Sequence, residues 1–154
     1  MSGKRIIIHS LADARAALAA ARALKSPIVL ASTDAAGGYA GPAWFKAVVD
    51  QARAEFPEVA ATVVLDCGDE AGTALVALQQ GFACVRFTGG VAALKRLKDI
   101  AGQLGATIET GRRPAALDLL DQRDPESAAR GYLAAPARRR VRKSSLAPAS
   151  TTVR

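Results

Sequence analysis

Short apolar runs alternate with longer amphipathic segments along most of the chain. The runs predict β-strands at 4–8, 28–31, 62–66, 83–87 and 106–109. Between them, apolar residues recur three or four positions apart, which is typical of helices with one buried side. The expected helices span 11–24, 42–56, 69–80, 90–104 and 114–120.

This order of elements predicts an α/β fold of about five βα units. The strand segments are continuously apolar rather than alternating, as in a parallel sheet that is covered on both faces. Two architectures fit, an open flavodoxin-like sheet or half of an aldolase-type TIM barrel. A complete barrel takes about 250 residues, more than the 154 of this chain.

Charge divides the chain into two parts. The net charge is +7, but six of the 21 basic residues and none of the 14 acidic ones lie in 136–154. We therefore predict a nearly neutral βα domain over 1–125 and a basic, disordered tail over 126–154. Nucleic acid or an acidic protein is an expected partner only through this tail.

The lengths of the apolar runs indicate where in the cell the protein is expected. No apolar run approaches the roughly 18 residues that a membrane span needs, so we expect no membrane association. The first residues resemble a strand rather than a signal peptide, and the expected location is the cytoplasm.

Metal-binding residues are scarce in the sequence. Cys67 and Cys84 are the two cysteines and His9 is the single histidine. A zinc site of the usual kind needs three or four ligands, so we predict no metal site and no cofactor for the chain alone.

Three segments lie where parallel strands are expected to end, which is where α/β proteins bind ligands. Asp66 ends the third strand and is the candidate acid–base residue. The loop 32–41, with Ser32 and Tyr39, has a glycine pair that exposes backbone N–H groups. Thr88, Gly89 and Gly90 precede the fourth long helix, whose N-terminus favours anions.

Several of these segments, in this order, resemble the N-terminal half of class II fructose-bisphosphate aldolases. Residues 11–41 are similar to that family's helix of alternating Ala and Leu, its second strand, and a loop ending Tyr-Ala-Gly. Residues 63–68 resemble its strand ending His-x-Asp-His-Gly, and 81–85 resemble its Gly-Phe-x-Ser-Val strand. Ile108 and Glu109 match a Val-Glu pair, so the resemblance covers roughly 6–111.

The resemblance implies metal-dependent cleavage of a sugar phosphate, but it also implies that metal-binding residues have been replaced. The family holds a divalent metal, usually zinc, and cleaves ketose bisphosphates, with an Asp that assists proton transfer. That Asp corresponds to Asp66, whereas the two histidines of the motif fall on Val64 and Cys67. The family's Asp-Gly-Ser beyond the fourth strand is replaced by Thr88-Gly89-Gly90.

We therefore expect an aldolase-like protein that has lost catalysis and binds a small phosphorylated metabolite. Asp66, Ser32, Tyr39 and the 88–90 segment would line the site. Self-association is expected, because half a barrel leaves apolar surface uncovered. One alternative is an active lyase that binds zinc as an oligomer, with His9 and Cys67 as ligands. A second is a non-enzymatic adaptor that acts through the basic tail.

Overall fold

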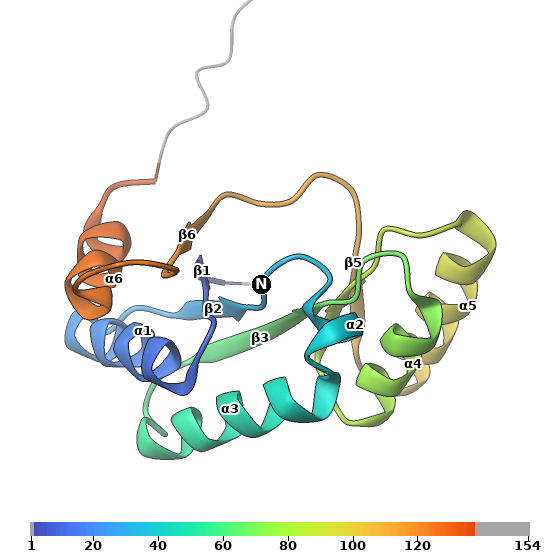
Figure 1. Ribbon diagram of the computed structural model, residues 1–154, viewed down its shortest axis with the longest axis horizontal. Coiled ribbons are helices and arrows are strands. Elements are labelled where there is room, and N and C mark those ends of the chain that lie inside the picture. Colours follow the sequence, from blue (N-terminus) through green and yellow to red (C-terminus); the bar gives the residue numbers. More distant parts are fainter. Residues whose placement is uncertain (1, 138–154) are drawn as a thin grey trace, which may run out of the picture.

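The computed structural model describes residues 2–137, which form six strands and six helices (Figure 1). Along the chain these are β1 (Lys4–Ile7), α1 (Leu11–Leu24), β2 (Ile28–Ala31), α2 (Ala36–Tyr39), α3 (Pro42–Glu55), β3 (Ala61–Asp66), α4 (Ala71–Gln79), β4 (Cys84–Arg86), α5 (Val91–Gln103), β5 (Thr107–Glu109), β6 (Ala116–Asp118) and α6 (Pro125–Ala134). Within 2–137 no helix is both long enough and apolar enough to cross a bilayer.

Local signals in the sequence explain where several helices begin. The Ser10 hydroxyl accepts a hydrogen bond from the backbone N–H of Asp13 and so caps α1. Pro42 occupies the first turn of α3, where its missing N–H costs nothing. The predicted loop at 32–41 contains one additional short turn of helix, α2.

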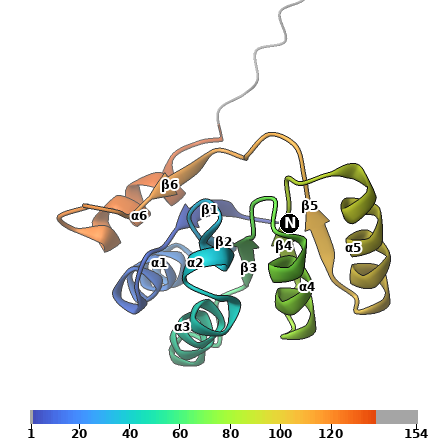
Figure 2. The ribbon, with the colours of Figure 1, turned by 45° about the vertical axis from the view of Figure 1, so that its right-hand side comes forward.

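The six strands form one parallel sheet in the order β5-β4-β3-β2-β1-β6. The predicted α/β class with a parallel sheet is therefore confirmed. The first five strands follow one another in sequence, as in a barrel, whereas a flavodoxin-like sheet has the order 2-1-3-4-5. From β1 to β5 each strand is added on the same side of the one before it. Right-handed crossovers then place the long helices on one face of the sheet, as Figure 2 shows.

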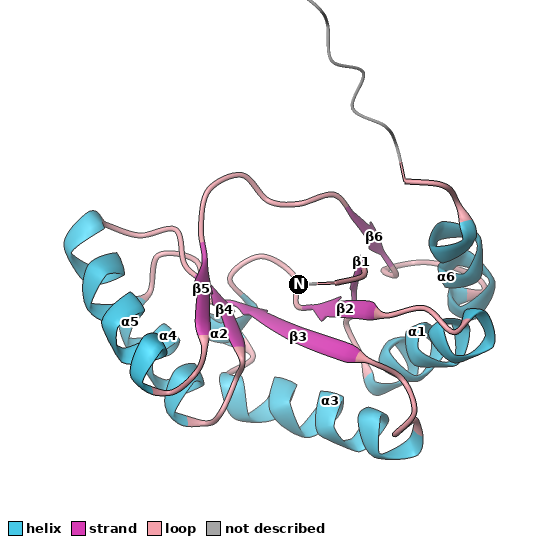
Figure 3. Ribbon diagram, turned by 180° about the vertical axis from the view of Figure 1, so that it is seen from behind, coloured by secondary structure: helices cyan, strands magenta, loops and turns pink. Residues whose placement is uncertain are grey.

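The two faces of the sheet are covered differently. Residues that point toward the helices form the main core, among them Ile6, Leu30 and Leu65. Their neighbours in sequence point the other way and form a smaller cluster that includes Ile7 and Val64. The segment 110–115, here called the connector, runs from β5 to β6 across that second face (Figure 3). An extended chain rather than a helix layer therefore crosses this face.

The sheet is strongly curled. Arg5 on β1 donates hydrogen bonds to Glu109 on β5, with Nη1–Oε1 2.8 Å and Nη2–Oε2 2.5 Å. These strands are four positions apart in the sheet, which in a flat sheet is about 19 Å at roughly 4.8 Å per step. That distance exceeds the combined reach of the two side chains, so the concave face must bring β1 and β5 toward each other.

The end of the folded region differs from our prediction. The helix expected at 114–120 is wrong, because 116–118 form β6 beside β1. Residues 125–134, most of which we assigned to the tail, form α6 and pack against α1. Asp124 caps that helix and Pro125 begins it, a start signal that the sequence already contained. Residues 138–154 of the predicted basic tail lie outside the described residues.

Candidate functional site

Asp66 connects two loops at the carboxyl end of the sheet. Its side chain is buried and its Oδ1 accepts hydrogen bonds from the backbone N–H groups of Ala35, at 3.1 Å, and Gly68, at 2.9 Å. Its own backbone N–H donates to the Ser32 hydroxyl oxygen at 2.9 Å. Asp66 therefore holds the loop after β2 against the end of β3.

A buried ionic group lies on the concave face beside Asp66. The Arg86 Nε is 3.5 Å from Asp66 Oδ2, and Arg86 also donates to Glu109 at 3.2 Å and to the Gly111 carbonyl at 2.5 Å. Burial opposes ionisation of Glu109, but hydrogen bonds and charge from Arg5 and then Arg86 outweigh it, so its pKa lies below its usual value. We call Arg5, Asp66, Arg86, Glu109 and Arg113 the arginine cluster.

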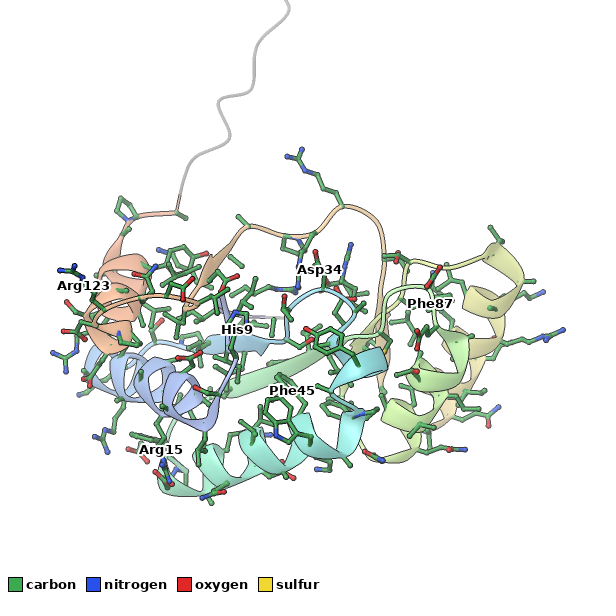
Figure 4. All side chains as sticks on the ribbon, in the orientation of Figure 1. His9, Arg15, Asp34, Phe45, Phe87 and Arg123 are labelled. Atoms are coloured by element: carbon green, nitrogen blue, oxygen red, sulfur yellow. The ribbon has the colours of Figure 1, made fainter. Side chains whose placement is uncertain are left out.

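Arg113 joins the connector to this cluster. Its Nη2 donates to the Ser32 carbonyl at 2.8 Å and lies 3.7 Å from Asp66 Oδ2, while its Nη1 pairs with Asp34. Burial, and then the nearby Arg5, lower the pKa of Arg113 below its usual value. Its Nε is buried and has no hydrogen-bond partner within residues 2–137. The Asp34 side chain is 79% exposed and lies on the loop after β2 (Figure 4).

These groups surround an open cleft of about 340 Å³. We call it the rim cleft, and its lining residues are Asp34, Asp66, Gly68, Arg86, Thr88 and Arg113. Its walls come from the loops that follow β2, β3, β4 and β5, so it lies where parallel α/β sheets place ligands. Two guanidinium groups and a hydroxyl group can donate hydrogen bonds to an anion here.

The predicted site residues are divided between two places. Asp66 and Thr88 line the rim cleft, and Ser32 contacts Asp66 and Arg113 beside it. Tyr39 does not line the rim cleft; it is 71% exposed and lines a second cavity that His9 also lines.

Gly89 and Gly90 precede α5 and have different surroundings. A Cβ on Gly89 would lie 2.4 Å from the Phe87 ring, so this position requires glycine, whereas nothing lies near Gly90. Gly90 is the N-cap of α5. Close packing against Phe87 therefore accounts for the first glycine of the pair without a ligand.

Sequence reasoning did not select Arg86, Arg113 or Asp34. Arg86 carried a usable signal, because it interrupts an otherwise apolar strand segment, whereas Arg5 follows Lys4 at the start of its strand and stands out less. A charged residue at such a position is buried and needs a partner. Arg113 carried no comparable signal, since its role depends on where the connector crosses the sheet.

The zinc ligands that the resemblance implies do not come together. Cys67 follows Asp66 directly but packs on the helix side of the sheet, and burial raises the pKa of its thiol to about 12. His9 lies elsewhere on the rim, with its Nε2 2.6 Å from Oδ1 of Asp118. Within 2–137 no three His, Cys, Asp or Glu side chains are grouped so that they could hold an ion. The residues present therefore do not fit a bound zinc ion.

Comparison with known proteins places this geometry in a family context. No family model matches the chain. A fructose-bisphosphate aldolase of Thermus caldophilus is 35% identical over 102 residues, which is 62% of this chain and 33% of that protein. The chain thus spans about a third of the length of this curated relative.

Two solved structures share the fold. A putative fructose-1,6-biphosphate aldolase from Coccidioides immitis has a TM-score of 0.56 and 18% identity, with 71% of this chain and 45% of that chain covered. A probable tagatose 6 phosphate kinase from Sinorhizobium meliloti has a TM-score of 0.56 and 16% identity, covering 86% and 45%. Over part of its length the chain is therefore similar to fructose-bisphosphate aldolase, in agreement with the resemblance drawn from its motifs.

Proposed function

We propose that this chain is an aldolase-like protein without metal-dependent cleavage activity that binds a small phosphorylated metabolite in the rim cleft. The position of the cleft at the carboxyl ends of the strands supports this proposal. Fructose bisphosphate and tagatose 6-phosphate, which appear in the names of the similar proteins, are phosphorylated sugars of a suitable kind.

The presence of two arginines, Arg86 and Arg113, in the lining of the rim cleft is the observation that carries the proposal. Within the arginine cluster, three arginines face two carboxylates, and the exposed Asp34 supplies the remaining negative charge. An exposed carboxylate that pairs with a partly buried arginine can be displaced by a stronger anion. Phosphate is such an anion, because a guanidinium group donates two parallel hydrogen bonds to it.

The positions of the candidate metal ligands support the proposed loss of cleavage. Class II cleavage depends on a divalent ion that polarises the substrate carbonyl. His9, Asp66 and Cys67 point to different surroundings, and Asp66 already accepts two backbone hydrogen bonds. The lyase alternative would require ligands from another subunit.

Calorimetric titration of the full chain tests the binding proposal. The ligands are fructose 1,6-bisphosphate, tagatose 6-phosphate and inorganic phosphate, with unphosphorylated fructose as the comparison. We expect saturable binding of the phosphorylated compounds and none of fructose. Arg113→Gln should weaken binding about tenfold or more, since it removes a charged hydrogen-bond donor worth about 1.5–3 kcal/mol. Asp34→Asn should tighten binding, because the competing carboxylate is gone.

Arg112→Gln is the matched control, since Arg112 is the exposed neighbour of Arg113 on the connector. Equal losses of affinity in the Arg112 and Arg113 variants would mean that binding depends only on the net positive charge of the connector. Failure of every phosphorylated compound to bind would reject the proposal. Stoichiometric zinc in the purified protein, together with cleavage of fructose 1,6-bisphosphate, would favour the lyase alternative instead.

Self-association is part of the same proposal. β5 and β6 are the edges of the sheet, so each has a strand neighbour on one side only. We expect the full chain to have the molar mass of a dimer or larger assembly in light scattering, and a monomeric mass across the concentrations used for binding would contradict this. The cytoplasmic location also remains a prediction.

A further inference from the structure

A second cavity lies across the loop Ser32–Asp34 from the rim cleft. Its volume is about 150 Å³. We call it the aromatic cavity, and its walls include His9, Thr33, Ala36, Tyr39, Trp44 and Phe45. Ser32 and Thr33 line this cavity whereas Asp34 lines the rim cleft, so the same loop separates the two spaces. None of the functions considered above uses the aromatic cavity as a separate site.

His9 is a polar group of this cavity that can exchange a hydrogen bond with a ligand. Its Nε2 is 2.6 Å from Oδ1 of Asp118, a residue 109 positions away on β6. The same Oδ1 accepts a hydrogen bond from the backbone N–H of Leu120 at 2.9 Å, so the carboxylate is held in place. A carboxylate accepts hydrogen bonds, so Nε2 is the donor in this pair, and Nδ1 is the ring nitrogen left for a ligand.

The apolar walls of the cavity suit one aromatic ring. Phe45 is buried, while Trp44 is 47% exposed and Tyr39 is 71% exposed. Aromatic residues are unusual on this chain, at 5% of the sequence, yet three of them border this one cavity. A cavity of about 150 Å³ lined by apolar groups is large enough for benzene.

We propose that the aromatic cavity binds a single-ring aromatic molecule whose hydroxyl group donates a hydrogen bond to Nδ1 of His9. Asp118 is a positioning residue in this arrangement, because it orients the imidazole without touching the ligand. Aromatic contacts with Tyr39, Trp44 and Phe45 hold the ring. This site is independent of phosphate binding in the rim cleft.

The indole N–H resonance of Trp44 provides a direct measurement, since Trp44 is the single tryptophan of the chain. Two-dimensional NMR of the full chain is followed during titration with phenol and, separately, with toluene. The two molecules have nearly the same shape, but only phenol has a hydroxyl group. We expect saturable shifts and about fivefold tighter binding of phenol, as one hydrogen bond of about 1 kcal/mol predicts. Toluene binding as tightly as phenol, or more tightly, would overturn the proposal, as would shifts that do not saturate.

Three variants test the roles of individual residues. His9→Phe keeps a ring and removes the acceptor, so phenol should bind no better than toluene. Asp118→Asn should weaken phenol binding and leave toluene binding unchanged. Arg112→Gln, at an exposed residue of the connector, is the control and should leave phenol binding unchanged. Unaltered preference for phenol in the His9 variant would reject the assignment, and the wild-type comparison of phenol with toluene decides the matter if a variant does not fold.

Discussion

Asp66 and Cys67 are adjacent in the chain but belong to opposite sides of the sheet. Asp66 points to the concave face and joins the arginine cluster, whereas Cys67 packs among the helix-facing core residues. Successive side chains along a strand alternate in direction, and this alternation carries one residue further here, so the carboxylate and the thiol face different surroundings.

Because Cys67 is buried, we expect its thiol to react slowly with alkylating reagents. Burial, and then the charges of Asp66 and Glu70, raise the pKa of its thiol from 9.0 to about 12. The thiolate fraction near neutral pH therefore falls roughly a thousandfold. Alkylation by iodoacetamide, followed by peptide mass spectrometry, should be far slower in the native protein than in urea.

An exposed cysteine introduced on α5, Ala92→Cys, is the control for reagent and conditions. It should react equally fast in native and denatured protein, because Ala92 is exposed. Native labelling of Cys67 at the rate of this control would contradict its burial.

Among the elements, β6 shows how a tertiary contact overrides local propensity. Residues 114–120 contain alanine and leucine, which favour helix, yet 116–118 pair with β1. Leu117 and Leu119 point into the main core on alternate positions, which is the period of a strand. β1 offers an otherwise unpaired edge, and pairing satisfies its backbone groups.

The start of α6 allows a test of stability at this scale. The Asp124 side chain accepts a hydrogen bond from the Ser127 backbone N–H at 3.0 Å, and α6 packs on α1 through the buried Ala129. We expect Asp124→Ala to lower the free energy of unfolding by about 1 kcal/mol, measured by urea denaturation of the full chain.

Asp99→Ala is the comparison for a surface aspartate. Asp99 is exposed on α5, so its removal should change stability by less than about 0.5 kcal/mol. Equal effects of the two variants would show that the cap at Asp124 contributes nothing specific.

For the molecule as a whole, the contact between Arg5 and Glu109 links strands at opposite ends of the five-strand run. Glu109 is only 12% exposed and also pairs with Arg86. Glu109→Gln would leave the buried Arg5 without a carboxylate and would leave Arg86 with Asp66 alone. We expect it to lower the free energy of unfolding by about 3 kcal/mol. Glu55→Gln, at the exposed pair with Arg15, should cost less than about 1 kcal/mol. Urea denaturation would contradict this role if the two losses were similar.

The lowered pKa of Glu109 leads to a prediction of how stability depends on pH. Because the pKa of Glu109 is lowered on folding, its stabilising effect is complete above its unfolded pKa, near 4.5, and is lost as pH falls through the folded value. The difference in unfolding free energy between wild type and Glu109→Gln should therefore shrink as the pH falls below about 4.5. A constant difference across that interval would indicate that Glu109 is not ionised in the folded protein.

Individual residues of the site show which parts of it could be predicted from the sequence and which could not. Ser32, Asp66 and Thr88 each end or directly follow a predicted strand, and all three lie at or beside the rim cleft. Tyr39 was placed with them on the same reasoning but lines the aromatic cavity. The turn of α2 directs it there, and nothing in the loop sequence predicts that turn.

The sequence by itself determined the periodicities, the caps, the order of strands and helices, and hence the parallel α/β class, because these depend on residues a few positions apart. Only the tertiary structure decided that the sheet curls, that Arg5 meets Glu109 across 104 positions, and that His9 meets Asp118 across 109. Such contacts depend on the accumulated twist of several strands and on the path of the connector. Small local changes add up over that distance, so short sequence patterns do not specify which distant side chains meet.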